Sequence, residues 1–207
     1  MPASPKTFWN KHARKYDKKL YKGPNYAARL ERAAAVFGDN ANVLDVGCAT
    51  GEITLDLAQH ARQIIGIDLA PNMTEAGNAK ARERSIDNAC FKPIEPTDPS
   101  LAEGSFDAIT NYSLLHLVDD APATLARFHS LLKPDGHLLT EAPCLGDWNP
   151  LWRVPIGLAG LVGMCPRIGI LKLVELEAMM TDAGFEILES KVYNPKSGMH
   201  GILAKRA

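Results

Sequence analysis

Apolar and polar positions in the first 38 residues follow a helical pattern. Aromatic and apolar side chains recur at every fourth residue on one face of a first stretch: Phe8, His12, Tyr16 and Leu20. Gly23-Pro24 interrupts this stretch, and a second amphipathic stretch runs from about Asn25 to Gly38, a residue type common at helix ends. We therefore predict that residues 1–38 form a cap of two helices on the rest of the chain.

From residue 43 onward, short apolar runs alternate with stretches of helical period. The pattern predicts strands at 43–46, 63–68, 89–94, 106–112 and 136–141. It predicts helices at 51–61, 71–85 and 120–132, and a turn at 133–136. A last helix at 173–183 precedes an antiparallel hairpin with strands at 185–193 and 199–205. This alternation is typical of an α/β fold, in which helices cover both faces of a parallel sheet.

The first strand of this pattern ends in a turn of small residues, Gly47-Cys48-Ala49-Thr50-Gly51, which opens a helix. Such a turn brings backbone N–H groups to the carboxyl edge of the sheet, as nucleotide sites do, although a tight turn without a ligand is the alternative. Asp68, at the end of the next strand, favours a nucleoside because a carboxylate can accept both ribose hydroxyls. A dinucleotide site would need glycine at Ala49 and Glu52, so the turn favours a nucleoside without phosphates.

The pattern Asp45-x-Gly47-x-Ala49-x-Gly51, followed by Asp68, resembles the first two motifs of class I S-adenosylmethionine-dependent methyltransferases. Residues 106–109 with 115–117, and residues 132–138, resemble that family's fourth and fifth strand motifs. The whole is most similar to the small-molecule group that includes ubiquinone/menaquinone C-methyltransferases. The resemblance implies a single Rossmann-like domain over 1–207, a doubly wound seven-stranded sheet of order 3-2-1-4-5-7-6 whose last inserted strand is antiparallel, and a substrate-covering insertion at 145–171.

The resemblance also implies roles for individual residues, with S-adenosylmethionine as cofactor and S-adenosylhomocysteine as product. The methionine part of the cofactor would be contacted by Asp45, Gly47, Cys48, Ala49, Gly51 and the backbone carbonyl of Asn111. The ribose would be held by Asp68, and the adenine by Leu69, Met73 and Glu95. Pro96 follows Glu95 and has no N–H to offer the adenine ring, which makes that end of the site depart from the family pattern.

Methyl transfer from a sulfonium depends mainly on positioning and desolvation, and it needs a base only where the accepting atom loses a proton. His116, just beyond the fourth strand, is a candidate base, and a structural histidine is the alternative. Tyr16 and Tyr21 are further candidates if the first helix closes over the site, or else they are core aromatics. Trp148, Trp152 and their apolar neighbours favour a small apolar or aromatic acceptor, methylated on O, N or C.

Composition and charge narrow the remaining alternatives. The chain has 207 residues, 46% hydrophobic and 23% charged, which excludes disorder. Nine Lys/Arg against two acids make residues 6–32 basic, but the rest is acidic, so we expect no nucleic-acid partner. The four cysteines form no CxxC pair, and we assign no metal, no secretory signal, no membrane span and a cytoplasmic location. A non-catalytic cofactor-binding protein and an RNA or protein methyltransferase stay as alternatives; a second copy of the chain is a candidate partner.

Overall fold

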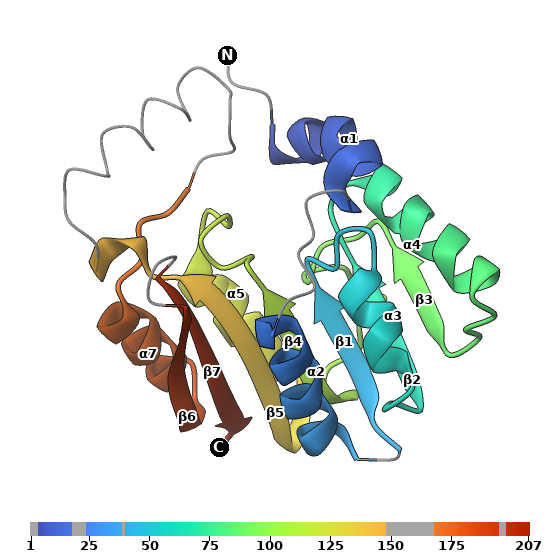
Figure 1. The fold of residues 1–207 in the computed structure, drawn as a ribbon. Helices are drawn as coiled ribbons and strands as arrows, with labels where there is room; N and C mark the ends of the chain where they lie inside the picture. The colour runs from blue at the N-terminus through green and yellow to red at the C-terminus, as the bar shows by residue number, and fades with distance from the viewer. Residues whose placement is uncertain (1–3, 18–23, 39, 148–167, 195–197) are drawn as a thin grey trace.

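The computed structural model describes residues 4–17, 24–38, 40–147, 168–194 and 198–207. One sheet contains seven strands: β1 (Asn42–Val46), β2 (Gln63–Ile67), β3 (Ala89–Lys92), β4 (Phe106–Tyr112), β5 (Leu132–Pro143), β6 (Phe185–Asn194) and β7 (Met199–Arg206). Their order is β3-β2-β1-β4-β5-β7-β6, and β7 runs antiparallel to both β5 and β6 (Figure 1). The predicted strand order and the antiparallel inserted strand are both confirmed.

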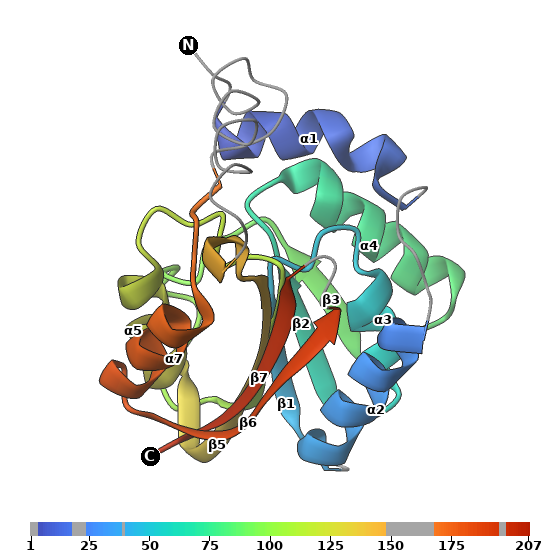
Figure 2. The same ribbon diagram turned by 60° about the vertical axis from the view of Figure 1, so that its left-hand side comes forward.

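Helices cover both faces of this sheet. They are α1 (Pro5–Tyr16), α2 (Pro24–Phe37), α3 (Glu52–Ala58), α4 (Pro71–Glu83), α5 (Ala121–Leu131) and α7 (Leu173–Asp182), with a short 3-10 turn, η2 (Leu145–Asp147). Figure 2 shows α2, α3 and α4 on one side of the sheet and α5 and α7 on the other. Helix α1 lies beside α4, over the carboxyl ends of the strands (Figures 1 and 2).

Two hydrophobic cores follow from the alternation of side chains along each strand, because successive residues point to opposite faces. In β1, Val43 packs with residues of α2 and α3, whereas the adjacent Leu44 packs with residues of α5 and α7. Phe37 of α2 and Phe128 of α5 are the aromatic residues that these helices contribute to the two cores. The two layers hold the carboxyl edge of the sheet rigid from both sides.

Most of the predicted elements are confirmed, with differences at several of their ends. The helix predicted at 51–61 spans 52–58: it begins after Gly51, whose left-handed φ of 79° makes it the N-cap, and it ends three residues early. The helix predicted at 71–85 ends at Glu83. Strand β3 ends at Lys92, two residues before the prediction. The turn predicted at 133–136 lies inside β5 as a bulge: Leu132 pairs with Phe106 and pairing resumes at 137, with Asp135 in the left-handed region.

Some predictions fall on residues outside the described part of the chain. Leu20 and Tyr21 belong to 18–23, and Trp148 and Trp152 belong to 148–167, which is most of the predicted insertion at 145–171. Among the described residues, no helix is both long and apolar enough to cross a bilayer.

Candidate functional site

The small-residue loop between β1 and α3 turns sharply at the carboxyl edge of the sheet. The backbone N–H groups of Gly47 and Cys48 both donate to the carbonyl of Ile67, at 2.8 and 3.1 Å, which ties the loop to the end of β2. Gly47 and Gly51 have φ values of 75° and 79°. Ala49, between them, is also left-handed, with a φ of 49°. An L-residue pays about 1 kcal/mol for that conformation, so the loop holds Ala49 where glycine would be unstrained.

The ring of Phe91 explains why three glycines lie around this loop. A Cβ added to Gly51, Gly66 or Gly77 would come within 2.5–2.7 Å of a ring carbon of Phe91. Gly51 is therefore required twice, by its left-handed backbone and by the close approach of the ring. The predicted cofactor-lining glycine also fixes how α3 and α4 pack against the sheet.

Asp45 lies beneath the loop and is almost completely buried, with 2% of its surface exposed. Its Oδ2 accepts from the hydroxyl of Thr54 at 2.5 Å, and its Oδ1 accepts from the hydroxyl of Thr110 at 2.8 Å. Burial raises the pKa of Asp45 to about 6, although the two hydroxyl donors act in the opposite direction. Among the described residues the carboxylate is held by neutral donors and has no ion-pair partner, although the charge of Arg29 also lowers its pKa.

Asp68, the predicted ribose ligand, holds the loop in the described structure. Its Oδ2 accepts from the N–H of Ala49 at 3.1 Å, and its Oδ1 accepts from the N–H of Ala70 at 2.8 Å. Burial raises the pKa of Asp68, while these two backbone donors oppose the rise. Each carboxylate oxygen can accept a second hydrogen bond, so these contacts leave acceptor capacity for a ligand.

A pocket opens between the loop, the end of β4 and the first helix. Its lining residues come from four elements and their loops: Tyr16, Asp45, Gly47, Cys48, Ala49, Thr50, Glu52, Ile53 and Tyr112. Neither lysine nor arginine is among these residues. The structure thus brings together the predicted residues Tyr16, Asp45 and the loop from two separate parts of the sequence.

Tyr112 is one of four pocket residues that the sequence analysis did not assign to the site; the others are Thr50, Glu52 and Ile53. Its hydroxyl is buried and has no hydrogen-bond partner among the described residues. The guanidinium of Arg29 lies over its ring, 4.8 Å from the centroid, and Arg29 also binds Glu141 through two nitrogens. Burial raises the pKa of Tyr112. Its place directly after Asn111, at the end of β4, was the signal that could have identified it.

Helix α1 reaches the pocket through Tyr16. The helix is fixed to the start of α4, where the N–H and Nδ2 of Asn72 donate to the side-chain and backbone oxygens of Asn10, at 3.0 and 3.2 Å. Tyr16 packs with the buried Met73, which is 1% exposed and lies beneath α1. Burial raises the pKa of Tyr16, and Asp68 adds to the rise. Met73 therefore packs against Tyr16 and Trp9 of α1 and against Ala49 of the loop, in one apolar cluster.

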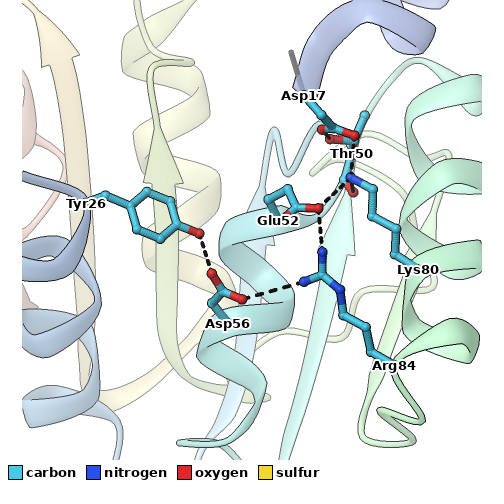
Figure 3. Close-up of polar contacts among 7 residues, drawn as sticks. All are labelled: Asp17, Tyr26, Thr50, Glu52, Asp56, Lys80 and Arg84. Atoms are coloured by element: carbon cyan, nitrogen blue, oxygen red, sulfur yellow. Dashed lines mark hydrogen bonds and ion pairs between the residues drawn. The ribbon is translucent and has the colours of Figure 1, made fainter. Parts of the chain in front are cut away.

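A polar network joins α1 to the loop and to both neighbouring helices (Figure 3). The ammonium of Lys80 lies 2.7 Å from Asp17, directly after α1, and 2.8 Å from Glu52 of α3, and it donates to the carbonyl of Thr50 at 3.1 Å. Arg84 binds Glu52 at 2.7 Å and reaches Asp56 at 3.6 Å. Lys80 of α4 and Arg84 directly after that helix thus hold Glu52, which the sequence analysis considered only as a departure from the dinucleotide pattern.

The remaining predicted residues lie outside the pocket lining. His116 is 9% exposed, its Nδ1 has no partner among the described residues, and burial lowers its pKa to about 4. Asn111 is fully buried and its Oδ1 accepts from the hydroxyl of Thr140 at 3.1 Å. Leu69 is half-buried, and the side chain of Glu95 is exposed beyond the end of β3. The roles predicted for these residues stay predictions.

The doubly wound sheet, with a small-residue loop and an acid at the carboxyl ends of β1 and β2, is the arrangement typical of nucleotide-binding α/β proteins. The chain belongs to the methyltransferase domain family, whose model matches residues 16–190. Helix α1 lies almost entirely before the matched region, although its last residue, Tyr16, is part of the pocket.

Two known relatives are O-methyltransferases by name. Nocamycin O-methyltransferase of Saccharothrix syringae is 35% identical over 114 residues, which are 52% of this chain and 41% of that protein. The ubiquinone biosynthesis O-methyltransferase of Xanthomonas axonopodis pv. citri is 29% identical over 185 residues, which are 82% of this chain and 71% of that protein. The chain therefore spans less than half the length of the first relative.

Solved structures share the fold at low sequence identity. Geranyl diphosphate C-methyltransferase from Streptomyces coelicolor A3(2), solved with S-adenosyl-L-homocysteine, superposes with a TM-score of 0.71 at 18% identity, and all of both chains is covered. The [4+2]-cyclase SpnF superposes with a TM-score of 0.70 at 18% identity, covering 86% of this chain and 80% of that chain. These likenesses concern the fold, which can carry more than one chemistry.

Proposed function

We propose that this chain transfers a methyl group from S-adenosylmethionine to a small molecule. The observation that carries the proposal is the acidity of the pocket: Asp45 lines it and is held by neutral hydroxyl donors, and neither lysine nor arginine is among the lining residues. The cofactor carries a sulfonium and an ammonium group, and buried acids favour such cations over the diphosphate of a dinucleotide. Membership in the methyltransferase domain family supports the same cofactor.

The residues around the pocket suit this cofactor. Gly47 and Ala49 both have a left-handed backbone, and the Tyr112 hydroxyl is a donor without an acceptor among the described residues. We assign the methionine end to Asp45 and the loop, and the ribose to the free acceptor positions of Asp68. The adenine end, with Leu69, Met73 and Glu95, and the backbone carbonyl of Asn111 keep the roles that the family resemblance implies.

When bound, the cofactor supplies an electrophilic methyl group: the acceptor's lone pair forms the new bond, and the sulfur keeps the electrons of the broken one. The protein contributes positioning and exclusion of water. A base is needed where the acceptor atom bears a proton. We assign this role to His116, which is neutral at pH 7 because burial lowers its pKa to about 4. Tyr16, at the pocket, and Tyr21 are the alternatives.

For the acceptor we propose a small apolar or aromatic molecule, methylated on oxygen. The names of the two relatives favour oxygen over nitrogen or carbon. The apolar composition of residues 148–167, with Trp148 and Trp152, favours an aromatic ring. We further propose a cytoplasmic location, since the cysteines of the described residues are free thiols: Cys48, Cys90 and Cys144.

Calorimetry tests the cofactor first. We expect S-adenosylmethionine and S-adenosylhomocysteine to bind and NAD not to bind. Asp68→Ala is expected to weaken S-adenosylmethionine binding roughly tenfold or more, since a hydrogen bond to a charged group is worth about 1.5–3 kcal/mol. Asp87→Ala is the matched control, because Asp87 is an exposed acid in the loop before β3. Tighter binding of NAD, or equal affinity in a folded Asp68→Ala variant, would contradict the nucleoside site.

Turnover is tested separately, with S-adenosylmethionine labelled in its methyl group and a panel of phenols, amines and activated carbon acids. We expect label in the phenols, and a fall in kcat without loss of cofactor binding in His116→Gln. Cofactor binding without transfer to any acceptor would favour a non-catalytic protein of this fold. Transfer to RNA or protein alone would favour the macromolecular alternative.

A further inference from the structure

Three side chains with metal-binding atoms meet at the carboxyl end of β5, outside the pocket described above. Cys144 directly follows β5, Asp147 ends η2, and His200 lies in β7, and one donor atom from each falls within 4.8 Å of the others. The antiparallel register creates this meeting, because Ala142 pairs with His200 and Pro143 with Met199. More than 50 residues separate His200 from the other two residues, so no short sequence motif could predict the cluster.

The chemistry of this Cys144–Asp147–His200 cluster is that of a zinc ligand set. Thiolate, imidazole and carboxylate are the three ligand types that zinc takes in proteins. The Nδ1 of His200 is buried and has no hydrogen-bond partner among the described residues, which is costly for a polar atom. The backbone N–H of Cys144 donates to the carbonyl of Gly198 at 2.8 Å, so the thiol is held beside β7.

The electrostatic surroundings of the cluster also favour a cation. The carboxylates of Asp147 and Glu177 both lie close enough to act electrostatically on the Cys144 thiol. A group that both acids act upon lies in a negative potential, which a divalent ion would neutralise. Asp147 uses one oxygen to accept from the N–H of Leu173 at 2.9 Å and so caps the start of α7. Among the described residues, its other oxygen accepts no hydrogen bond.

We propose that Cys144, Asp147 and His200 bind one divalent transition-metal ion of the zinc type. Bonds of about 2.0–2.3 Å hold neighbouring ligands of a tetrahedral zinc site roughly 3.5 Å apart, a spacing within the 4.8 Å limit on the separations of these donor atoms. The fourth position is left for water. The ion would join the end of β5, η2 and β7, and this role is independent of the proposed methyl transfer.

Cobalt titration of the metal-stripped full chain tests the site, because Co²⁺ substitutes for zinc and reports its ligands by colour. We expect one Co²⁺ per chain, tetrahedral visible bands, a thiolate-to-cobalt charge-transfer band in the near ultraviolet, and loss of all of them on adding Zn²⁺. Cys144→Ser is expected to lose the charge-transfer band and at least tenfold in affinity. His200→Gln is expected to weaken binding similarly but to keep the thiolate band at saturating Co²⁺.

Cys90→Ser is the matched control, because Cys90 is a free thiol on β3 of the same sheet and lies outside the cluster. It should bind Co²⁺ like the original chain. Thermal unfolding with and without Zn²⁺ guards against misfolded variants: Zn²⁺ should raise the midpoint of the original chain and of Cys90→Ser, but not of Cys144→Ser. A cobalt spectrum without a thiolate band, or equal affinity in Cys144→Ser and the original chain, would overturn the proposal.

Discussion

Asp45 is predicted to destabilise the fold at neutral pH, and its replacement by asparagine should reveal by how much. The carboxyl is 2% exposed, and burial raises its pKa to about 6 from an ordinary value of 3.8. Asparagine has the same shape and can bond both neighbouring hydroxyls, since each hydroxyl of Thr54 and Thr110 can donate or accept. Asp45→Asn therefore removes the buried charge and keeps the contacts.

The sign follows from proton binding. Folded Asp45 holds its proton up to about pH 6, whereas the unfolded chain loses it near pH 4, so the folded state binds more protons between these values. Stability at this site therefore falls as pH rises through that window. At about 1.36 kcal/mol per pH unit, the loss approaches 3 kcal/mol above pH 6. Relative to the original chain, Asp45→Asn should gain that amount progressively between about pH 4 and pH 6.

Urea unfolding at several pH values between 4 and 7.5 measures this gain. A constant difference in hydrogen bonding would shift all points equally, so the change with pH is the diagnostic quantity. Asp107→Asn is the control of opposite sign: partial burial opposes ionisation of Asp107, but Lys133 and the N–H of Asn42 outweigh it and lower its pKa. An unchanged pH dependence in Asp45→Asn would refute the reasoning. Cofactor binding should weaken roughly tenfold in the same variant.

Ala49, Lys80 and His116 each allow a further prediction. Ala49→Gly should change the free energy of unfolding by roughly 0 to +1 kcal/mol, because it relieves the left-handed φ but gives the unfolded chain more conformational freedom. The control Ala126→Gly, at an exposed position of α5, should lower the free energy of unfolding by about 1 kcal/mol. Equal losses in the two variants would show that position 49 is unstrained. Lys80→Met removes two ion pairs of a side chain that is 17% exposed and should lower the free energy of unfolding in urea by about 1–3 kcal/mol. The control Lys133→Met removes a single ion pair whose lysine side chain is 40% exposed and should lower it by less than about 1 kcal/mol. Similar losses in the two variants would argue against a cooperative network. The unfolded chain protonates His116 near pH 6.5 and the folded chain near 4, so stability at this site is lost as pH falls through that window, and His116→Gln should reduce this acid loss in thermal unfolding at pH 7 and pH 4.5; an unchanged loss would contradict it.

The sequence could predict the fold because its signals are local. The period of apolar residues separates strands from helices, and Gly38 and Gly184 end their helices in the left-handed conformation, as their positions in the pattern indicate. The strand order came from the family resemblance, since periodicity does not say which strands pair. The predicted helix boundary was wrong where one residue fits two positions in the pattern. Gly51 could be the first residue of a helix, but its φ of 79° places it outside α3.

The site was predictable in its position and less so in its contacts. The loop and Asp68 were expected at one edge of the sheet, and they lie there. Their bond through the N–H of Ala49 depends on side-chain rotation that no pattern encodes. Lys80 binds acids from two other elements across the fold, and Cys144 meets His200 only through strand register. Such long-range meetings follow from packing, which a single sequence does not reveal.

The kind of partner that holds each acid decides the charge that the pocket presents. Glu52 is paired with Lys80 of α4 and with Arg84 directly after that helix, so most of its charge is compensated within the protein. Asp45 is held by hydroxyls and Asp68 by backbone N–H groups, and these neutral donors support a carboxylate without adding a positive charge. These two acids at the carboxyl edge thus have no ion-pair partner among the described residues, and only the more distant Arg29 acts on Asp45. A net positive nucleoside relieves this repulsion when it binds, whereas a diphosphate would increase it, and selectivity between them needs no contact with the phosphates at all.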